Sequence, residues 1–234
     1  MKILKISLGG KFAHFGINGT NDKNNRYSYQ HITGSSIKGI LGAIMGYKGW
    51  GELEGKQQTP EFLEKLENIS YGVVPKQFKF NSMLHTYNNT SGVNKNDKGS
   101  GTLQITEEIL EDVSWDIYLR NLPQEVIDKI LGNTSTYILS LGKKGFLMDK
   151  FKSQILDGEE LLSNKVNSII PANLNKEADD IFDLEEPVNE SLNFLYSTNF
   201  YNRSEVFALT TSSLSKKIKV LNVEGKNIYM VGEI

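Results

Sequence analysis

The sequence predicts an α+β protein whose order of strands and helices is compatible with the split β-α-β arrangement of a ferredoxin-like domain. Two observations support this class. Short apolar runs typical of strands alternate along the chain with segments that carry helix start signals. Three more strand-like runs close the sequence over residues 206–231. A length of 234 residues fits one large domain or a domain with an elaborated insertion.

The N-terminal elements are the clearest in the sequence. Ile3–Leu8 is apolar enough to be a central strand, and a helix is predicted over residues 37–46 that Thr33 or Ser35 can cap. Three glycines lie at i, i+3 and i+7 on one face of this helix: Gly39, Gly42 and Gly46. Each glycine costs about 1 kcal/mol relative to alanine inside a helix. The glycine stripe therefore indicates close approach of another backbone or of a ligand.

Helices and strands are expected to alternate through the rest of the chain. The predicted helices are Pro60–Leu66, capped by Thr59, and Pro123–Leu131. The predicted strands are residues 69–80 as a pair or one bent strand, Ser114–Arg120, Tyr137–Leu141, Phe146–Phe151, Val206–Thr210, Lys217–Val223 and Ile228–Val231. The polar residues 86–101 are expected to form a long loop or a hairpin tip. Residues 157–200 have an acidic centre and are expected to be irregular.

Composition limits the class of protein. The absence of cysteine excludes disulfides and thiolate metal sites and fits a reducing compartment. No apolar run approaches the roughly 20 residues of a membrane span, and the N-terminus lacks the shape of a signal peptide. We therefore expect a cytoplasmic protein with no membrane partner.

The charge of the chain is unevenly distributed. The net charge is −2, but residues 1–100 carry 13 Lys and Arg against 7 Asp and Glu. Residues 176–190 carry one Lys against seven carboxylates. RNA binding depends on a local basic surface rather than on the global sum, so an RNA partner is compatible with this sequence. Two ordinary solvated faces are the alternative interpretation.

The sequence lacks the residue patterns of most catalytic and cofactor-binding sites. The histidines His14, His31 and His85 are too dispersed for a metal site. The acidic residues of 179–186 more simply form a solvated loop than a cation site. No Walker, dinucleotide-binding or nucleophile-elbow spacing occurs. We therefore expect neither a metal nor a cofactor.

Single-stranded RNA fits the remaining features. Such RNA is held by backbone N–H groups and basic side chains on phosphate, with aromatic side chains stacking on bases. Ser35, Ser36 and Lys38 occupy the predicted helix N-terminus, where an anion is favoured. Basic residues also follow the first strand and fill a later glycine turn, namely Lys11, His14, Lys143 and Lys144. The alternative is that the serines only cap the helix and Tyr29 only packs.

The first 50 residues resemble the N-terminal signature of the fifth CRISPR-associated (Cas) protein family, the subunits of Cascade that hold the 5′ end of the guide RNA. The likeness rests on Phe12-Ala13-His14-Phe15, Thr20-Asn21, Ser28-Tyr29, Ser35-Ser36 and Lys38 to Gly46. Weaker likenesses are Leu141 to Gly145 and Lys226 to Val231. The resemblance implies a single domain over residues 1–234 with the RRM-like fold of the RAMP superfamily. It also implies a long β-hairpin thumb over residues 76–106, followed by an irregular extension.

The resemblance further implies a structural RNA-binding subunit of a type I Cascade complex in antiviral defence, and the size and general appearance of the chain suggest an I-B-like system. Such a subunit caps the crRNA 5′ handle, contacts the backbone and large subunits, and meets target DNA only through the complex. The residues expected to contact RNA are Lys11, His14, Asn21, Arg26, Tyr29, Ser35, Ser36, Lys38, Lys76, Lys79, Met83, His85, Tyr87, Lys143 and Lys144.

Two other functions stay open at this point. One subfamily of these proteins cuts precursor crRNA with a Tyr/Lys/His group. In the present chain Met45 occupies the tyrosine position, and the Lys-His pair has no counterpart. We therefore expect that the protein is not an enzyme. Because Tyr47 lies only two residues from Met45, a metal-independent endoribonuclease is the alternative function. The other alternative is a ferredoxin-like protein–protein module whose glycine-rich helix is plain packing.

Overall fold

The computed structural model describes residues 1–17, 24–53, 59–89, 103–171, 174, 190–197, 200–210 and 213–232, and for 190–206 it describes the backbone alone. The helices are α1 Gly34–Met45, the 3-10 helix η1 Trp50–Glu52, α2 Glu61–Lys65 and α3 Gln124–Leu131. The strands are β1 Lys2–Ala13, β2 Asn25–Arg26, β3 Ser70–Pro75, β4 Asn81–Asn89, β5 Leu103–Arg120, β6 Lys150–Asp157, β7 Glu159–Ser163, β8 Ile170–Pro171, β9 Glu190–Ser197, β10 Phe200–Ala208, β11 Ile218–Val223 and β12 Lys226–Ile228.

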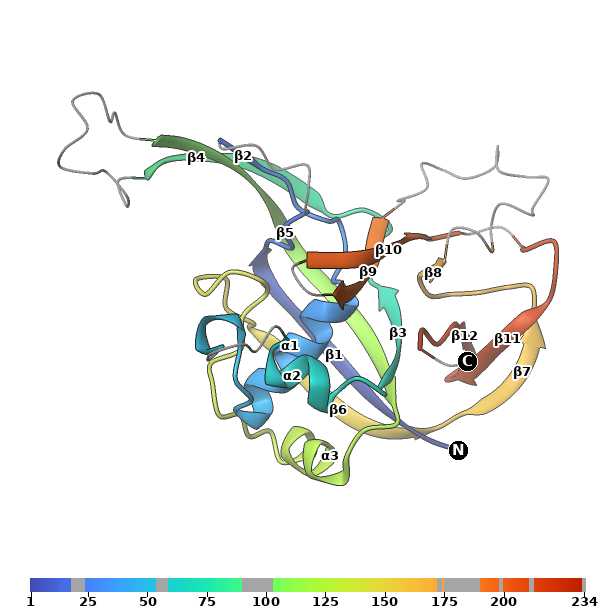
Figure 1. Ribbon diagram of the computed structural model, residues 1–234. Coiled ribbons are helices and arrows are strands. Elements are labelled where there is room, and N and C mark those ends of the chain that lie inside the picture. Colours follow the sequence, from blue (N-terminus) through green and yellow to red (C-terminus); the bar gives the residue numbers. More distant parts are fainter. Residues whose placement is uncertain are drawn as a thin grey trace, which may run out of the picture.

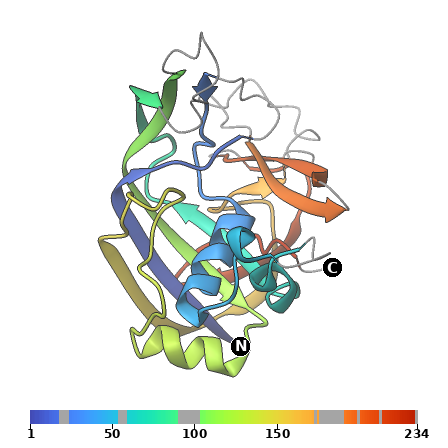
Figure 2. The same ribbon diagram turned by 60° about the vertical axis from the view of Figure 1, so that its left-hand side comes forward.

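The main sheet is built around β1 and β5. Its order is β2-β5-β1-β6, and both β3 and β4 also pair with β5. The predicted central position of the first strand is confirmed, because β1 pairs antiparallel with β5 on one side and with β6 on the other. Helices α1 and α2 lie over one face of this sheet (Figures 1 and 2). The predicted α+β class is therefore confirmed.

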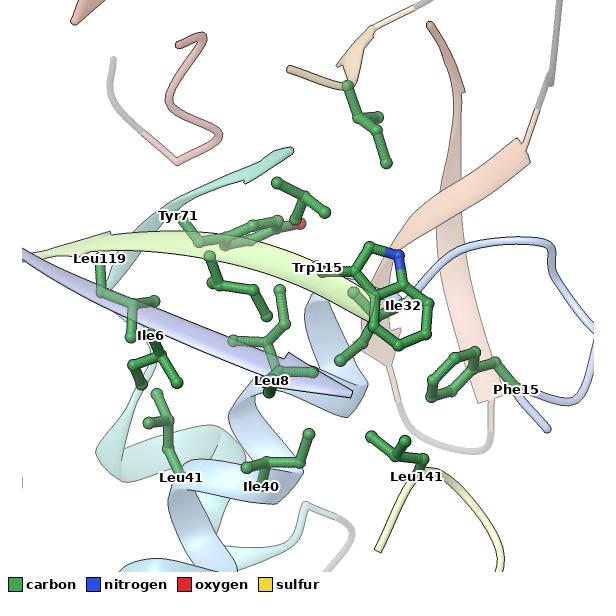
Figure 3. Packing of buried hydrophobic residues seen from close by; sticks show 14 of the residues in the cluster. Ile6, Leu8, Phe15, Ile32, Ile40, Leu41, Tyr71, Trp115, Leu119 and Leu141 are labelled. Atoms are coloured by element: carbon green, nitrogen blue, oxygen red, sulfur yellow. The ribbon is translucent and has the colours of Figure 1, made fainter. Parts of the chain in front are cut away.

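The hydrophobic core lies between the sheet and α1. Alternation along β1 directs Leu4, Ile6 and Leu8 to the helical face, where they form one cluster with the apolar residues of α1, Ile37, Ile40, Leu41 and Ile44. Figure 3 shows Ile6 and Leu8 of this strand beside Ile40 and Leu41 of the helix. Trp115 of β5 is fully buried and forms edge-on ring contacts with Phe15 and Phe80, at centroid distances of 5.8 and 5.0 Å. These contacts fix the end of β1 and the start of β4 against β5.

A long hairpin extends from this core (Figure 1). Strand β4 pairs antiparallel with β5 from Asn81↔Glu111 to Asn89↔Leu103. The predicted strand Ser114–Arg120 is only the second half of β5, whose first half belongs to the hairpin. Residues 90–102, the tip of the predicted thumb, lie outside the described residues. The thumb limits of 76–106 stay a prediction.

The predicted helix with the glycine stripe is confirmed as α1, with Thr33 as its N-cap. A Cβ added to Gly42 would lie 2.5 Å from Cβ of Phe62 in α2, whereas one added to Gly39 would meet ordinary contact at 3.9 Å. Gly46 ends the helix with φ of 84°, a left-handed conformation that favours glycine. Close approach is thus the reason for one glycine, and chain termination for another.

Four element predictions need correction. The N-cap of α2 is Pro60 rather than Thr59, and it makes no side-chain cap hydrogen bond. Tyr137–Leu141 and Phe146–Phe151 are not two strands, because residues 139–148 form a compact loop with a single bridge, Ser140↔Leu147, and β6 begins only at Lys150. Residues 69–80 give only β3, which ends at Pro75. Residues 157–200 are not simply irregular, since β7 pairs with β11, β8 pairs with β10, and β9 also pairs with β10. No helix among the described residues is long and apolar enough to cross a membrane.

Candidate nucleic-acid interface

A groove of about 470 Å³ opens at the N-terminal end of α1. It lies between this helix, the chain that follows β1, the 139–148 loop, η1 and α2. Five residues predicted to contact RNA line the groove: His14, Tyr29, Ser35, Ser36 and Lys143. Among the lining residues that were not predicted to contact RNA are Trp50, Phe62 and Ile138. The fold therefore brings together residues from segments more than a hundred positions apart.

The helix end in this groove is polar and carries no compensating acid. Thr33 Oγ1 accepts a hydrogen bond from the backbone N–H of Ser36 at 3.1 Å. The Ser35 and Ser36 hydroxyls lie 3.0 and 2.8 Å from the same oxygen. The first turn of α1 contains no acidic residue, so the partial positive charge of the helix end is not neutralised by its own side chains. Both serine side chains are half-buried and reach the groove.

A close contact between two loops forms the opposite wall. The His14 backbone N–H donates to the Leu141 carbonyl at 3.1 Å. Gly142 has φ of 93°, and a Cβ there would overlap the His14 carbonyl oxygen. Only glycine fits this position. The Leu141–Gly145 motif noted in the sequence thus holds the 139–148 loop against the end of β1 and places Lys143 at the groove.

The charge of Lys143 is largely balanced by a buried acid. Lys143 Nζ lies 2.5 Å from Oε2 of Glu107, whose side chain is only 2% exposed. His14 Nε2 lies 3.5 Å from the other oxygen of this carboxylate, and His14 Nδ1 lies 2.7 Å from the Glu108 carbonyl oxygen. His14 and Lys143 therefore hold the groove in shape. The neighbouring Lys144 is exposed and makes no ion pair with the described residues.

Predicted residues at the base of the hairpin form a second group. Strand alternation places Met83, His85 and Tyr87 on one face of β4. The His85 and Tyr87 rings stack at 5.8 Å. Arg26 Nη1 donates to the Tyr87 hydroxyl at 3.4 Å, and Lys143 Nζ lies 5.4 Å from the Tyr87 ring centroid. Through Lys143 this hairpin group adjoins the groove.

The remaining predicted residues lie elsewhere. Lys38 does not line the groove: its Nζ donates to the Glu67 carbonyl at 3.2 Å, and burial lowers its pKa despite the nearby Glu67 carboxylate. Lys11 lies over the Phe12 ring, and Lys79 is exposed. Lys76 pairs with Asp116, on the sheet face away from the helices. Asn21 lies outside the described residues.

Sequence reasoning missed the apolar rim of the groove. Trp50 is 48% exposed and Ile138 is 81% exposed, large values for such side chains. Tyr29, in contrast, is buried and contributes mainly to packing. In the sequence, Trp50 lies between Gly49 and Gly51 outside any apolar run. This position could have indicated a tryptophan at the surface. Within the described residues, no group of three or more His, Asp or Glu side chains could hold a metal ion.

Comparison with known proteins gives one family and several structural neighbours. The family described as "CRISPR-associated protein (Cas_Cas5)" matches residues 3–115. No curated protein matches the chain. A chain of a "CRISPR RNA-guided surveillance complex" is 10% identical with a TM-score of 0.55, over 93% of this chain and 91% of that one. A CRISPR protein from Archaeoglobus fulgidus is 13% identical with a TM-score of 0.48, over 97% and 98% of the two chains. The first of these likenesses shows a shared fold.

Proposed function

Since the chain belongs, over residues 3–115, to the CRISPR-associated Cas5 family, we propose that it is a structural RNA-binding subunit of a type I Cascade effector complex. In this role it caps the 5′ handle of the crRNA and contacts the backbone and large subunits. The observation that carries the proposal is the groove at the N-terminus of α1. This groove combines an uncompensated helix end with an exposed aromatic wall.

The helix end is suited to a phosphate of the handle. The first backbone N–H groups of a helix lack partners within the helix, and they attract anions together with the helix dipole. Ser35 and Ser36 add hydroxyl donors at the same place. Because Glu107 already balances Lys143, the exposed Lys144 is the more available cation for a second phosphate. Lys38 has no part in this binding, as its Nζ is engaged with Glu67.

The rim of the groove is suited to a base. Trp50 and Ile138 present apolar surface to solvent at its opening. Stacking of a base on an aromatic side chain contributes about 1–3 kcal/mol and is available to unstacked single-stranded RNA. A nucleotide with its phosphate at Ser35 and Ser36 and its base against Trp50 would use both halves of the groove. This arrangement would hold one splayed nucleotide of the handle.

The endoribonuclease alternative finds little support in the geometry. Met45 packs partly against the core. The Tyr47 hydroxyl donates to Glu125 Oε1 at 3.1 Å, and burial together with this carboxylate raises the pKa of Tyr47. A tyrosine with a raised pKa stays protonated and is a poor general base. Tyr47 is also not among the residues that line the groove. The protein–protein alternative would account for the exposed Trp50, but it gives no role to the helix end that lacks an acid.

The test is RNA binding by the chain assembled with its partner subunits, using an RNA that carries the host's CRISPR repeat. Loss of one stacked base predicts that Trp50→Ala weakens binding about 5- to 150-fold. Tyr137→Ala is the matched control, because Tyr137 is equally exposed at 48% but does not line the groove. Equal affinities of the two variants would contradict the proposed site. Cleavage of the repeat RNA by the wild type, with loss of cleavage in Tyr47→Phe, would establish the endoribonuclease instead.

A further inference from the structure

The sheet has a second face, opposite the helices, which the groove does not use. The alternation that sends Leu4, Ile6 and Leu8 toward α1 sends Lys5 and Ser7 to this other face. Register places Asp116 of β5 opposite Ser7, and Lys152 of β6 opposite Ser7 on its other side. This row of polar residues crosses three neighbouring strands.

Within the part of the chain that the structure describes, only part of this face is covered by other elements. Near the start of β1, Ile3 and Tyr118 pack in a cluster with Leu221, Val223 and Ile228 from β11 and β12. Nearer the end of β1 the exposed side chains are polar or charged. We call the residues of this second part, Ser7, Lys76, Ser114, Lys150, Lys152 and Lys226, the basic sheet face.

One side of the basic sheet face is a lysine cluster around a single buried acid. Asp116 Oδ2 lies 2.5 Å from Lys76 Nζ, 3.6 Å from Lys5 Nζ and 3.7 Å from Lys226 Nζ. Ser7 Oγ donates to its other oxygen at 2.6 Å. Burial works against ionisation, but the hydrogen bonds from Lys76 and Ser7 lower the pKa of Asp116. The ionised carboxylate balances one of three ammonium groups.

A further acid enters the cluster but leaves a cationic excess. Lys5 Nζ is bonded at 2.7 Å to Glu224 Oε2. Lys76 and Lys226 keep 46% and 38% of their side chains exposed. These two lysines therefore share one carboxylate between them while still facing solvent.

The other side of the basic sheet face carries lysines that no acid of the described residues pairs with. Lys150 and Lys152 of β6 are exposed and make no hydrogen bond or ion pair with the described residues. Lys150 lies level with Ser114 across Gly9, and Lys152 lies level with Asp116 across Ser7. With strands about 4.8 Å apart, β6 and β5 are separated by roughly 10 Å, and the ammonium groups of Lys76 and Lys226 lie at Asp116 on β5. Small neutral side chains, Ser7 and Ser114, lie between the two lines of charge.

We propose that the basic sheet face binds the sugar–phosphate backbone of a single strand of RNA, as a contact separate from the groove. The two lines of lysine would contact phosphates on either side of the strand, and the serines between them leave room for the sugars. Because the aromatic Tyr118 on this sheet face is buried, base stacking does not contribute and binding should be independent of sequence. A protein partner is less suited, since interfaces have apolar centres depleted of charge.

The experiment measures binding of a 20-residue oligouridylate to the full chain over a range of salt concentrations. In Lys150→Ala/Lys152→Ala we expect the slope of log K against log salt to fall by about 1.4, because each single-strand phosphate contact contributes about 0.7. Lys217→Ala is the control, an exposed lysine outside both surfaces, and should keep the wild-type slope. Thermal unfolding of each variant checks that the fold is retained.

A second comparison separates this proposal from that of the groove. Trp50→Ala should weaken binding of repeat RNA in the assembled complex yet keep the oligouridylate salt slope. The double lysine variant should lower the oligouridylate salt slope and have the smaller effect on binding of repeat RNA in the complex. An unchanged affinity and slope in the double lysine variant would overturn the proposal. If that variant instead loses a partner subunit during purification while its RNA binding is normal, the surface is a protein interface and the proposal is wrong.

Discussion

Two glycines on one face of α1 should respond to the same substitution with opposite sign. Replacing glycine by alanine in a helix gains about 1 kcal/mol of intrinsic propensity. At Gly39 the new Cβ would meet its nearest atom, Phe62 Cε2, at 3.9 Å, which is an ordinary contact. We therefore expect Gly39→Ala to stabilise the protein by about 1 kcal/mol.

At Gly42 the new Cβ would lie 2.5 Å from Phe62 Cβ and 3.2 Å from Phe62 Cγ. The first of these atoms is next to the backbone, so α2 itself has to move by about an ångström. Overpacking of this kind costs about 1–3 kcal/mol and outweighs the gain in propensity. We expect Gly42→Ala to be destabilising by up to about 2 kcal/mol, and Gly42→Leu to be more so.

Thermal unfolding decides between these expectations. For a chain of this size, 1 kcal/mol corresponds to about 2–4 °C in Tm. Gly39→Ala should raise Tm by a few degrees, and Gly42→Ala should lower it. If Gly42→Ala raises Tm as much as Gly39→Ala does, the contact between α1 and α2 is not tight and the packing explanation of the glycine stripe is wrong.

Three other outcomes can be measured with single variants. Lys38→Ala should leave the salt slope of RNA binding unchanged and lower the stability by about 1 kcal/mol, because the hydrogen bond to the Glu67 carbonyl is lost. A slope lower by about 0.7 would show instead that Lys38 contacts a phosphate. His31 is buried, and burial lowers its pKa from 6.5 to about 4. Between these pH values the unfolded chain binds more protons than the folded one, so the free energy of unfolding should fall by about 3 kcal/mol as pH drops from 6.5 to 4. Denaturant titrations of His31→Gln should not show this loss. Lys143→Met should destabilise the fold by about 1–3 kcal/mol because it leaves Glu107 buried without its cation, and Lys143→Arg should restore most of that loss in the same denaturant titration.

The elements that the sequence predicted best are those whose signals are local. Helix α1 has a Thr33 cap and a terminal glycine, and β1 begins with four apolar residues among Ile3–Leu8, so both could be predicted without tertiary information. Tyr137–Leu141 and Phe146–Phe151 are also largely apolar, but residues 139–148 form a loop, because Gly142 packs against the backbone of His14. That contact joins segments far apart in the chain, which no local pattern reveals.

The site was predictable to a similar degree. Ser35 and Ser36 lie at the helix end where the sequence predicted them, since the cap fixes their place there, and both line the groove. Lys38 follows them by only two residues yet points to Glu67, because the helical turn carries it to another side of α1. Trp50 enters the groove only through the packing of η1 near α2, a tertiary arrangement absent from the linear sequence.

The length of β5 has a mechanical consequence for the hairpin. Residues 103–111 of this strand pair with β4, residues 110, 111 and 113–119 pair with β1, and Trp115 is buried between the sheet and the helices. An extended strand of this length reaches about 60 Å. The outer part of β5 therefore extends from the body together with β4, while its inner part is held in the sheet between β1 and β3. Asp112, with a left-handed φ of 49°, interrupts the pairing of β5 with β1 between Glu111 and Val113, next to the innermost pair of the hairpin, Asn81↔Glu111.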